Sequence, residues 1–255
     1  MKDERKPIIF LDIGSHKCQE IFALTSPAIY ILILYIKRSI LGFVFKQRLV
    51  PPIKDLISFL CDRRKIFKRF KFYFVVVEPN WRHFRNKIYR QVDNVFCLGI
   101  HDSDKTIQSL PFYYKSSEML CQGATLFEHS VKHYRVEMVP VIDADHFFRY
   151  VFDPYMRKFD FDSGTGLVQL RAPQVLLRVN CEGAEDDVLY AAQDVLGARL
   201  KGVLGSLDDV LKKKGEDAAT VLEGFIEESQ LGFCRFSSNM ASWPSAIKYI
   251  GAKLD

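Results

Sequence analysis

Three apolar runs of the chain end abruptly in acidic or small polar residues. They span residues 8–14 (IIFLDIG), 72–80 (FYFVVVEPN) and 177–185 (LRVNCEGAE). Strands of a parallel sheet that are buried on both faces have such continuous apolar sequences. In open α/β sheets, ligands bind beyond the carboxyl ends of the strands. The pattern therefore predicts three parallel strands whose ends form one binding crevice.

The rest of the chain alternates between short apolar runs and helical patterns. We expect further strands at 95–100, 136–141, 203–205 and 231–236, an added antiparallel strand or hairpin at 106–114, and loops at 115–130 and 159–166. We expect helices at 81–91, 144–152, 185–196, 207–214 and 218–229. Strands that alternate with helices favour βαβ units. The prediction is an α/β protein with a Rossmann-like, doubly wound, mostly parallel sheet, in a single domain over 1–255.

A basic segment, residues 24–71, lies between the first two expected strands. It carries eleven Lys or Arg and two acids, a net charge of +9, whereas the whole chain has +5. Pro27 suits a first helical turn and Pro51 and Pro52 interrupt the pattern, so we expect a helical insertion of two or three helices. Its apolar run 28–36 is too short to span a bilayer. Three interpretations stay open: a helical lid with a solvated basic face, a surface for an anionic membrane or ligand, and a nucleic-acid surface.

The cysteines and the first residues bear on the compartment. Six cysteines are scattered through the 255 residues and form no C-x-x-C pair. This favours free thiols in a reducing compartment over a disulfide framework or a zinc site. The start, MKDERKPIIFLDIG, lacks the apolar core and cleavage site of a signal peptide. We therefore expect a cytoplasmic protein, with 24–71 as the segment that makes any peripheral membrane contact.

The ends of the first two expected strands carry candidate binding chemistry. Asp12 and Gly14 open a turn into a helix, where glycine lets the backbone approach a ligand and the helix start offers free N–H groups. A strand-to-helix turn capped by Ser15 explains the same residues without a ligand. Glu78 ends the second strand, a position where an acid accepts hydrogen bonds from ribose hydroxyls in doubly wound folds. A capped helix start after Asn80 is the structural alternative.

Together these motifs resemble the FkbM-like family of class I S-adenosylmethionine-dependent methyltransferases. That family typically shows a D-x-G-A-N-x-G turn, an E-P-N end to its second strand, and K-I-D-V-E-G-A-E after a later strand. This chain has DIGSHKC at 12–18, VEPN at 77–80 and LRVNCEGAE at 177–185, in the same order. Residues 94–114 also resemble the family's third strand and hairpin. The resemblance covers most of the chain outside the basic segment.

The resemblance implies S-adenosylmethionine as the cofactor and assigns residues to its parts. Asp12 and Gly14 would line the methionine part, Glu78 the ribose, and Asp102 or its neighbour His101 the adenine edge. The predicted cofactor site also contains the neighbouring turn residues Ser15, His16, Pro79 and Asn80.

The end of the later strand carries the candidate catalytic groups. Methyl transfer to a hydroxyl requires in-line placement of the acceptor and benefits from a nearby base. The resemblance places Glu182 and Glu185 near the methyl-transfer position, and Glu182 is the first candidate for the base. Capping of the following helix is a compatible structural role for it. Weaker candidates for the base are His146, Asp143 and Asp145. Asn180 and Glu185 are predicted to contact the acceptor.

Three departures from the family pattern affect these assignments. Cys18 stands where the family has its second Gly, Arg178 where it has Lys, and Asn180 where it has Asp. Because an amide takes up no proton at neutral pH, Asn180 cannot serve as a base. No histidine pair has a metal-ligand spacing, and we expect no metal.

The function that the resemblance implies is O-methylation of a carbohydrate or glycan hydroxyl, with lipid- and nucleotide-linked sugars among the acceptors. The basic segment keeps a nucleic-acid 2′-O-methyltransferase open as an alternative. Cys18 and Asn180 keep open a protein that binds the cofactor or acts as a scaffold without catalysis. A dehydrogenase is disfavoured, because the first turn lacks G-x-G-x-x-G.

Overall fold

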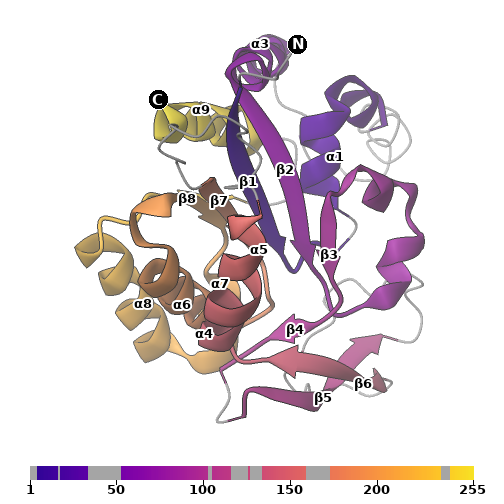
Figure 1. Cartoon of the computed structure of the whole chain (residues 1–255), viewed down its shortest axis with the longest axis vertical. Helices are drawn as coiled ribbons and strands as arrows, with labels where there is room; N and C mark the ends of the chain where they lie inside the picture. Colours follow the sequence, from indigo (N-terminus) through magenta and orange to yellow (C-terminus); the bar gives the residue numbers. More distant parts are fainter. Residues whose placement is uncertain are drawn as a thin grey trace.

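The computed structural model describes residues 5–16, 18–33, 53–102, 105–115, 126, 134–158, 173–236 and 242–255. Its central sheet has six parallel strands in the order β3-β2-β1-β7-β8-β9 (Figure 1). The strands are β1 (Lys6–Ile13), β2 (Phe70–Val77), β3 (Asn94–Phe96), β7 (Gln174–Val179), β8 (Leu200–Gly205) and β9 (Phe233–Arg235). Counted along the chain within this sheet, the order is 3-2-1-4-5-6, that of a Rossmann-like fold. The predicted fold class is confirmed.

Helices cover both faces of this sheet. The alternation of side chains along β1 sends Ile9 and Leu11 into one hydrophobic cluster, and Ile8 and Phe10 into another. The first cluster takes side chains from α4 (Ala144–His146), the π-helix η3 (Phe147–Phe152), α5 (Asp153–Arg157), α6 (Glu185–Leu196), α7 (Asp208–Lys214) and α8 (Glu216–Glu228). The second takes them from α1 (Gln19–Thr25), α3 (Ile53–Arg69), η2 (Lys87–Gln91) and α9 (Trp243–Leu254). Burial on both faces explains why the strands are continuous apolar runs.

A smaller sheet of three strands, in the order β4-β6-β5, lies beyond the carboxyl ends of the central strands (Figure 1). It contains β4 (Gly99–Ile100), β5 (Ile107–Lys115) and β6 (Tyr134–Ile142), with β5 antiparallel to β6. The predicted strand 95–100 is therefore wrong as one element, because β3 and β4 belong to different sheets. A tight turn separates them, in which Leu98 N–H donates to the Phe96 carbonyl (3.1 Å).

The basic segment 24–71 is helical where the structure describes it. Residues 27–33 are helical, and α3 begins at Ile53 and ends at Arg69. Phe70 and Lys71 already belong to β2, and residues 34–52 lie outside the described part. The buried side chains Leu56, Phe59 and Ile66 pack α3 into the same cluster as α9. No helix of the described residues combines the length and apolar character needed to cross a bilayer.

Two predicted helices differ in detail from the structure. The segment predicted as one helix at 81–91 forms two 3₁₀ helices, η1 (Trp81–Arg85) and η2. The side chains of Asn80 and Asn86 accept hydrogen bonds from the N–H groups two residues on, so each asparagine starts its own short turn. The helix predicted at 144–152 is confirmed in position but changes to a π-helix at Phe147. The loop 115–130, except Lys115 and Leu126, and the turn 159–166 lie outside the described residues.

Candidate functional site

A cleft opens where the chain leaves β1 and β7 in opposite directions. This is the switch point of the sheet, where open α/β folds bind their ligands. The cleft has a cavity volume of about 50 Å³, within about 520 Å³ of empty space that includes open solvent. Of the predicted site residues, it is lined by Gly14, His16, Glu78, Pro79, Asn180 and Glu182.

The first turn is shaped by close packing of its backbone. Gly14 has φ +73° and donates its N–H to the Val77 carbonyl (2.9 Å), while Asn180 N–H donates to the Ile13 carbonyl (3.0 Å). A Cβ on Gly14 would lie 2.0 Å from the Asn180 carbonyl oxygen. Only glycine fits there, so the ends of β1, β2 and β7 are held together at the base of the cleft.

Replacing Gly14 by Ala should lower the free energy of unfolding by about 2–3 kcal/mol, the cost of a strained left-handed residue plus displacement of the Asn180 carbonyl. Urea unfolding measures this loss. Gly215→Ala is the matched control, because Gly215 also has positive φ (+94°) but a Cβ there would meet no atom within 4 Å. Gly215 has a ψ of 179°, in a backbone region that is essentially restricted to glycine, so the change should cost backbone strain alone, about 1–2 kcal/mol. Equal losses in the two variants would show that backbone strain, and not the contact with Asn180, makes Gly14 necessary.

Glu78 is a buried acid whose carboxylate reaches the cleft. Its side chain accepts the His16 N–H (2.8 Å) and the Asn80 N–H (2.9 Å), and the residue is 4% exposed. Burial raises the pKa of Glu78 to about 7, against the lowering effect of these two hydrogen bonds. A carboxylate has about four acceptor sites, so Glu78 can still accept hydrogen bonds from a ligand hydroxyl.

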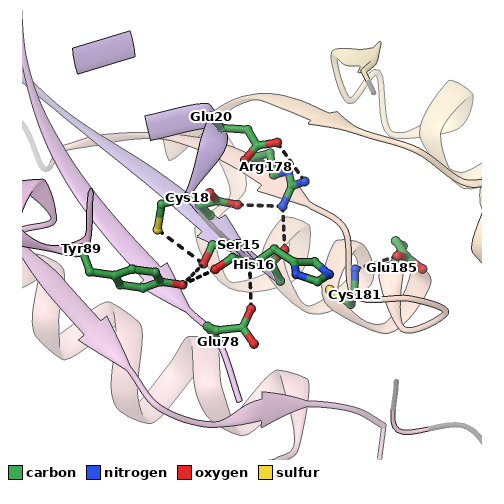
Figure 2. Close-up of polar contacts among 11 residues, drawn as sticks. Ser15, His16, Cys18, Glu20, Glu78, Tyr89, Arg178, Cys181 and Glu185 are labelled. Carbon is green, nitrogen blue, oxygen red and sulfur yellow. Dashed lines mark hydrogen bonds and ion pairs between the residues drawn. The ribbon is translucent and has the colours of Figure 1, made fainter. Parts of the chain in front are cut away.

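Ser15 supports the first turn from behind (Figure 2). Its Oγ lies 3.0 Å from the Tyr89 hydroxyl, which donates to the His16 carbonyl (2.7 Å). The Cys18 thiol lies 3.7 Å from Ser15 Oγ, and burial raises the pKa of that thiol. Cys18 adopts φ +52° at the start of α1. Ser15 and Cys18 therefore shape the turn and do not line the cleft.

Asp12 lies in a buried ion-pair cluster with Arg178 and Glu20. One guanidinium nitrogen of Arg178 binds Asp12 Oδ1 (3.0 Å) and the Gly14 carbonyl (2.8 Å). The other binds Glu20 Oε1 (3.1 Å), and Figure 2 labels this second pair. Asp12 is 0% exposed, and burial raises its pKa to about 7 although Arg178 opposes the shift. The structure thus places Asp12 beneath the first turn and not in the lining of the cleft.

Glu185 organises the loop that follows β7. Its two carboxylate oxygens accept the N–H groups of Cys181 (2.7 Å) and Gly183 (2.8 Å). The residue is 0% exposed, and burial raises its pKa to about 7. The loop carries Glu182 at φ +58° and Gly183 at φ +117°. Glu185 therefore holds the loop in shape, while Glu182 lines the cleft.

Glu182 has the electrostatic character of a group that changes protonation near neutral pH. Burial, together with the negative charge of Asp209, raises its pKa to about 6, while Lys212 and Arg178 oppose the shift. At pH 7 it is therefore mainly ionised, and able to accept a proton from an acceptor hydroxyl.

The remaining predicted residues lie outside the cleft lining. His101 Nδ1 lies 3.5 Å from Asp187, which also accepts the Asp102 N–H (3.3 Å). His146 packs on Tyr150 with ring centroids 4.5 Å apart, and its N–H donates to Asp143 Oδ1 (2.9 Å). The structure does not bring His146 and Glu182 together at the cleft.

Several lining residues were not predicted. The lining includes an apolar wall from Leu98, Ile100, Phe112 and Leu126, and its other members not predicted are Ile13, Val77, His83, Gly99 and Cys181. His83 lies against His16, with ring centroids 5.1 Å apart. The sequence signal for this wall was the hairpin at 106–114, but the position of the wall depends on long-range pairing of β4 with β6.

In the described part of the chain, no three His, Cys, Asp or Glu side chains are grouped to hold a metal ion.

Comparison of the chain with known protein families, with curated proteins and with solved structures finds no match in any of the three. The resemblance to the FkbM-like family therefore consists of the sequence motifs alone.

Proposed function

We propose that this protein is an S-adenosylmethionine-dependent O-methyltransferase with a carbohydrate or glycan hydroxyl as acceptor. The observation that carries the proposal is the carboxylate of Glu78, which lines a cleft at the switch point beside the tight Gly14 turn. An acid at this position binds the ribose hydroxyls of nucleoside cofactors in doubly wound folds. The acceptor class comes from the resemblance to the FkbM-like family.

The chemical character of the residues that line the cleft fits a nucleoside cofactor. Glu78 would accept hydrogen bonds from the ribose, and the apolar wall with Phe112 and Leu126 would cover the base. The Gly14 turn lets the backbone approach the ligand closely. Because the cavity volume is only about 50 Å³, this wall would have to move outward when a ligand enters.

The proposed chemistry assigns separate tasks to the two acids of the cleft. When bound, the cofactor would supply an electrophilic methyl group, whose carbon–sulfur bond breaks so that the sulfonium leaves as a neutral thioether. Glu78 binds and orients the cofactor's sugar, and Glu182 orients the acceptor hydroxyl and takes its proton as the new oxygen–carbon bond forms. Glu185 keeps Glu182 at the cleft through its hydrogen bonds to Cys181 and Gly183. Asn180, which lines the cleft, would donate or accept a hydrogen bond to the acceptor.

A second candidate is a protein that binds the cofactor without methyl transfer. It is favoured by the burial of Asp12 in an ion pair with Arg178, and by Asn180 at a position where the related motif has Asp. Binding of the cofactor without turnover on any offered sugar would support this candidate.

Calorimetry with S-adenosylmethionine, and with its demethylated product, tests the binding proposal. Glu78→Ala should weaken binding by about 1–3 kcal/mol, the cost of leaving ribose hydroxyls without an acceptor. Since the Glu78 pKa is about 7, its protonation should also weaken binding as the pH falls below that value. The control is Glu223→Ala, which removes an exposed acid of α8 that pairs with Arg235. It should leave binding unchanged. Absence of binding by the intact protein would rule out both candidates.

A further inference from the structure

The outward face of α3 combines exposed apolar side chains with cations. Ile53 is 68% exposed and Ile57 56%. Arg64 and Lys68 follow on the same side of the helix, because residues spaced by three, four or seven positions share a face. Lys54 and Lys65 flank this stripe and are exposed as well. We name Ile53, Lys54, Ile57, Arg64 and Lys68 the α3 outer face.

The cations of this face are not used to hold the fold together. Lys54, Arg64 and Lys68 form no ion pair or hydrogen bond with any other residue that the structure describes. By contrast, Arg63 donates to the Leu24 carbonyl and lies over the Phe67 ring, and Arg69 pairs with Asp255. Lys65 pairs with Asp62 at 3.2 Å. The helix therefore separates its structural cations from those that point to solvent.

We propose that the α3 outer face docks the protein on an anionic membrane surface. An interfacial helix buries apolar side chains at the level of the lipid head groups and pairs its cations with anionic lipids. Ile53 and Ile57 supply the apolar contact, and Lys54, Arg64 and Lys68 supply the charge. The opposite side of α3 is fixed on the protein by Leu56, Phe59 and Ile66, so the face is presented on a rigid element. The contact is peripheral, since no described helix can cross a bilayer.

The composition of the face favours lipid over nucleic acid. Exposed isoleucines gain free energy only where they leave water for an apolar phase. Single-stranded nucleic acid is held instead by aromatic side chains on which bases stack, and the α3 outer face has none. In Figure 1, α3 lies at the end of the molecule away from β4, β5 and β6, whose sheet walls the cleft. Membrane docking is therefore independent of cofactor binding.

Co-sedimentation of the full chain with vesicles tests the proposal. The protein should bind vesicles of phosphatidylcholine with phosphatidylserine, bind phosphatidylcholine alone much less, and dissociate as salt is added. The triple change Lys54→Glu, Arg64→Glu and Lys68→Glu should weaken binding by about tenfold or more. Ile53→Ser with Ile57→Ser should also weaken it, with charge unchanged.

A matched triple change, Lys87→Glu, Arg90→Glu and Lys158→Glu, alters the net charge equally at exposed positions outside α3 and should retain most of the binding. Equal loss in both triple variants would overturn the proposal in favour of unspecific attraction by net charge. Failure to bind either vesicle would also overturn it. Fluorescence anisotropy with single-stranded RNA tests nucleic acid as the alternative partner. If the protein binds RNA but not vesicles, and the α3 triple change abolishes RNA binding, the face would be assigned to nucleic acid.

Discussion

Replacing Arg178 by Met should lower the free energy of unfolding by about 3–5 kcal/mol, because it leaves two buried carboxylates without their cation. Arg178 binds Asp12 and Glu20 at 3.0 and 3.1 Å, and all three residues are at most 3% exposed. Methionine has a similar length and keeps most of the packing, so the loss reports the ion pairs. Urea unfolding near neutral pH measures it.

Arg157→Met is the matched control, since the Arg157 side chain is exposed and its partner Asp153 keeps a second cation, Arg199. It should cost less than about 1 kcal/mol. A similar small loss for Arg178→Met would mean that the buried cluster contributes little to stability. Adding Asp12→Asn to Arg178→Met should recover part of the loss, because it removes one of the charges left without a partner.

The loss in Arg178→Met should grow with pH. Arg178 lowers the pKa of Asp12, which burial has raised to about 7, so removing the guanidinium raises that pKa further. The folded variant then binds a proton that the unfolded chain, with an aspartate pKa of about 3.9, has already released. The stability from this proton is present at low pH and is lost as the pH rises through the folded pKa. Unfolding at about pH 5 and about pH 8 should therefore show the larger deficit at the higher pH.

The central sheet could be predicted because its signal is local. β1, β2 and β7 are buried on both faces, so their sequences are mainly apolar and end where the cleft begins. The helix α6 has the predicted bounds, since Gly197 follows its last residue with φ +49°. Each of these features is determined by residues adjacent in sequence.

The parts that could not be predicted depend on pairing between distant residues. Asp12 lies opposite Arg178 in the register of β1 and β7. Because of this register, Asp12, a candidate cofactor residue, forms a buried ion pair with Arg178. β4 is separated from β3 by its pairing with β6, which sets Gly99 beside Val141. Both carboxylate oxygens of Glu185 accept hydrogen bonds from backbone N–H groups of its own loop. The sequence does not distinguish this role from acceptor binding.

The two acids of the 182–185 loop therefore have different roles, and their environments explain the difference. Glu185 has both oxygens bound to backbone N–H groups and no exposure. Glu182 lines the cleft, and its nearby charges, Asp209 and Lys212, belong to α7. Of the pair, only Glu182 has a carboxylate that can meet an acceptor at the cleft.

On the proposed function, Glu182→Gln should lower kcat by roughly 10²–10⁴-fold, the usual contribution of a general base. Glutamine keeps the size and hydrogen bonding of the side chain and removes its ability to take a proton. Affinity for the cofactor should change little, because Glu78 carries that contact in the proposal. Steady-state turnover with sugar acceptors measures kcat, and calorimetry measures cofactor affinity.

The pH dependence separates a base from a residue that only shapes the loop. The base works when ionised, so kcat should rise with pH through about 6, the Glu182 pKa, and level off above it. Asp209 raises this pKa, so Asp209→Asn should move the midpoint to lower pH while leaving the plateau nearly unchanged. A midpoint that stays in place, or near-normal turnover by Glu182→Gln, would remove Glu182 from the mechanism and direct the search for the base to His16 and His83, the histidines that line the same cleft.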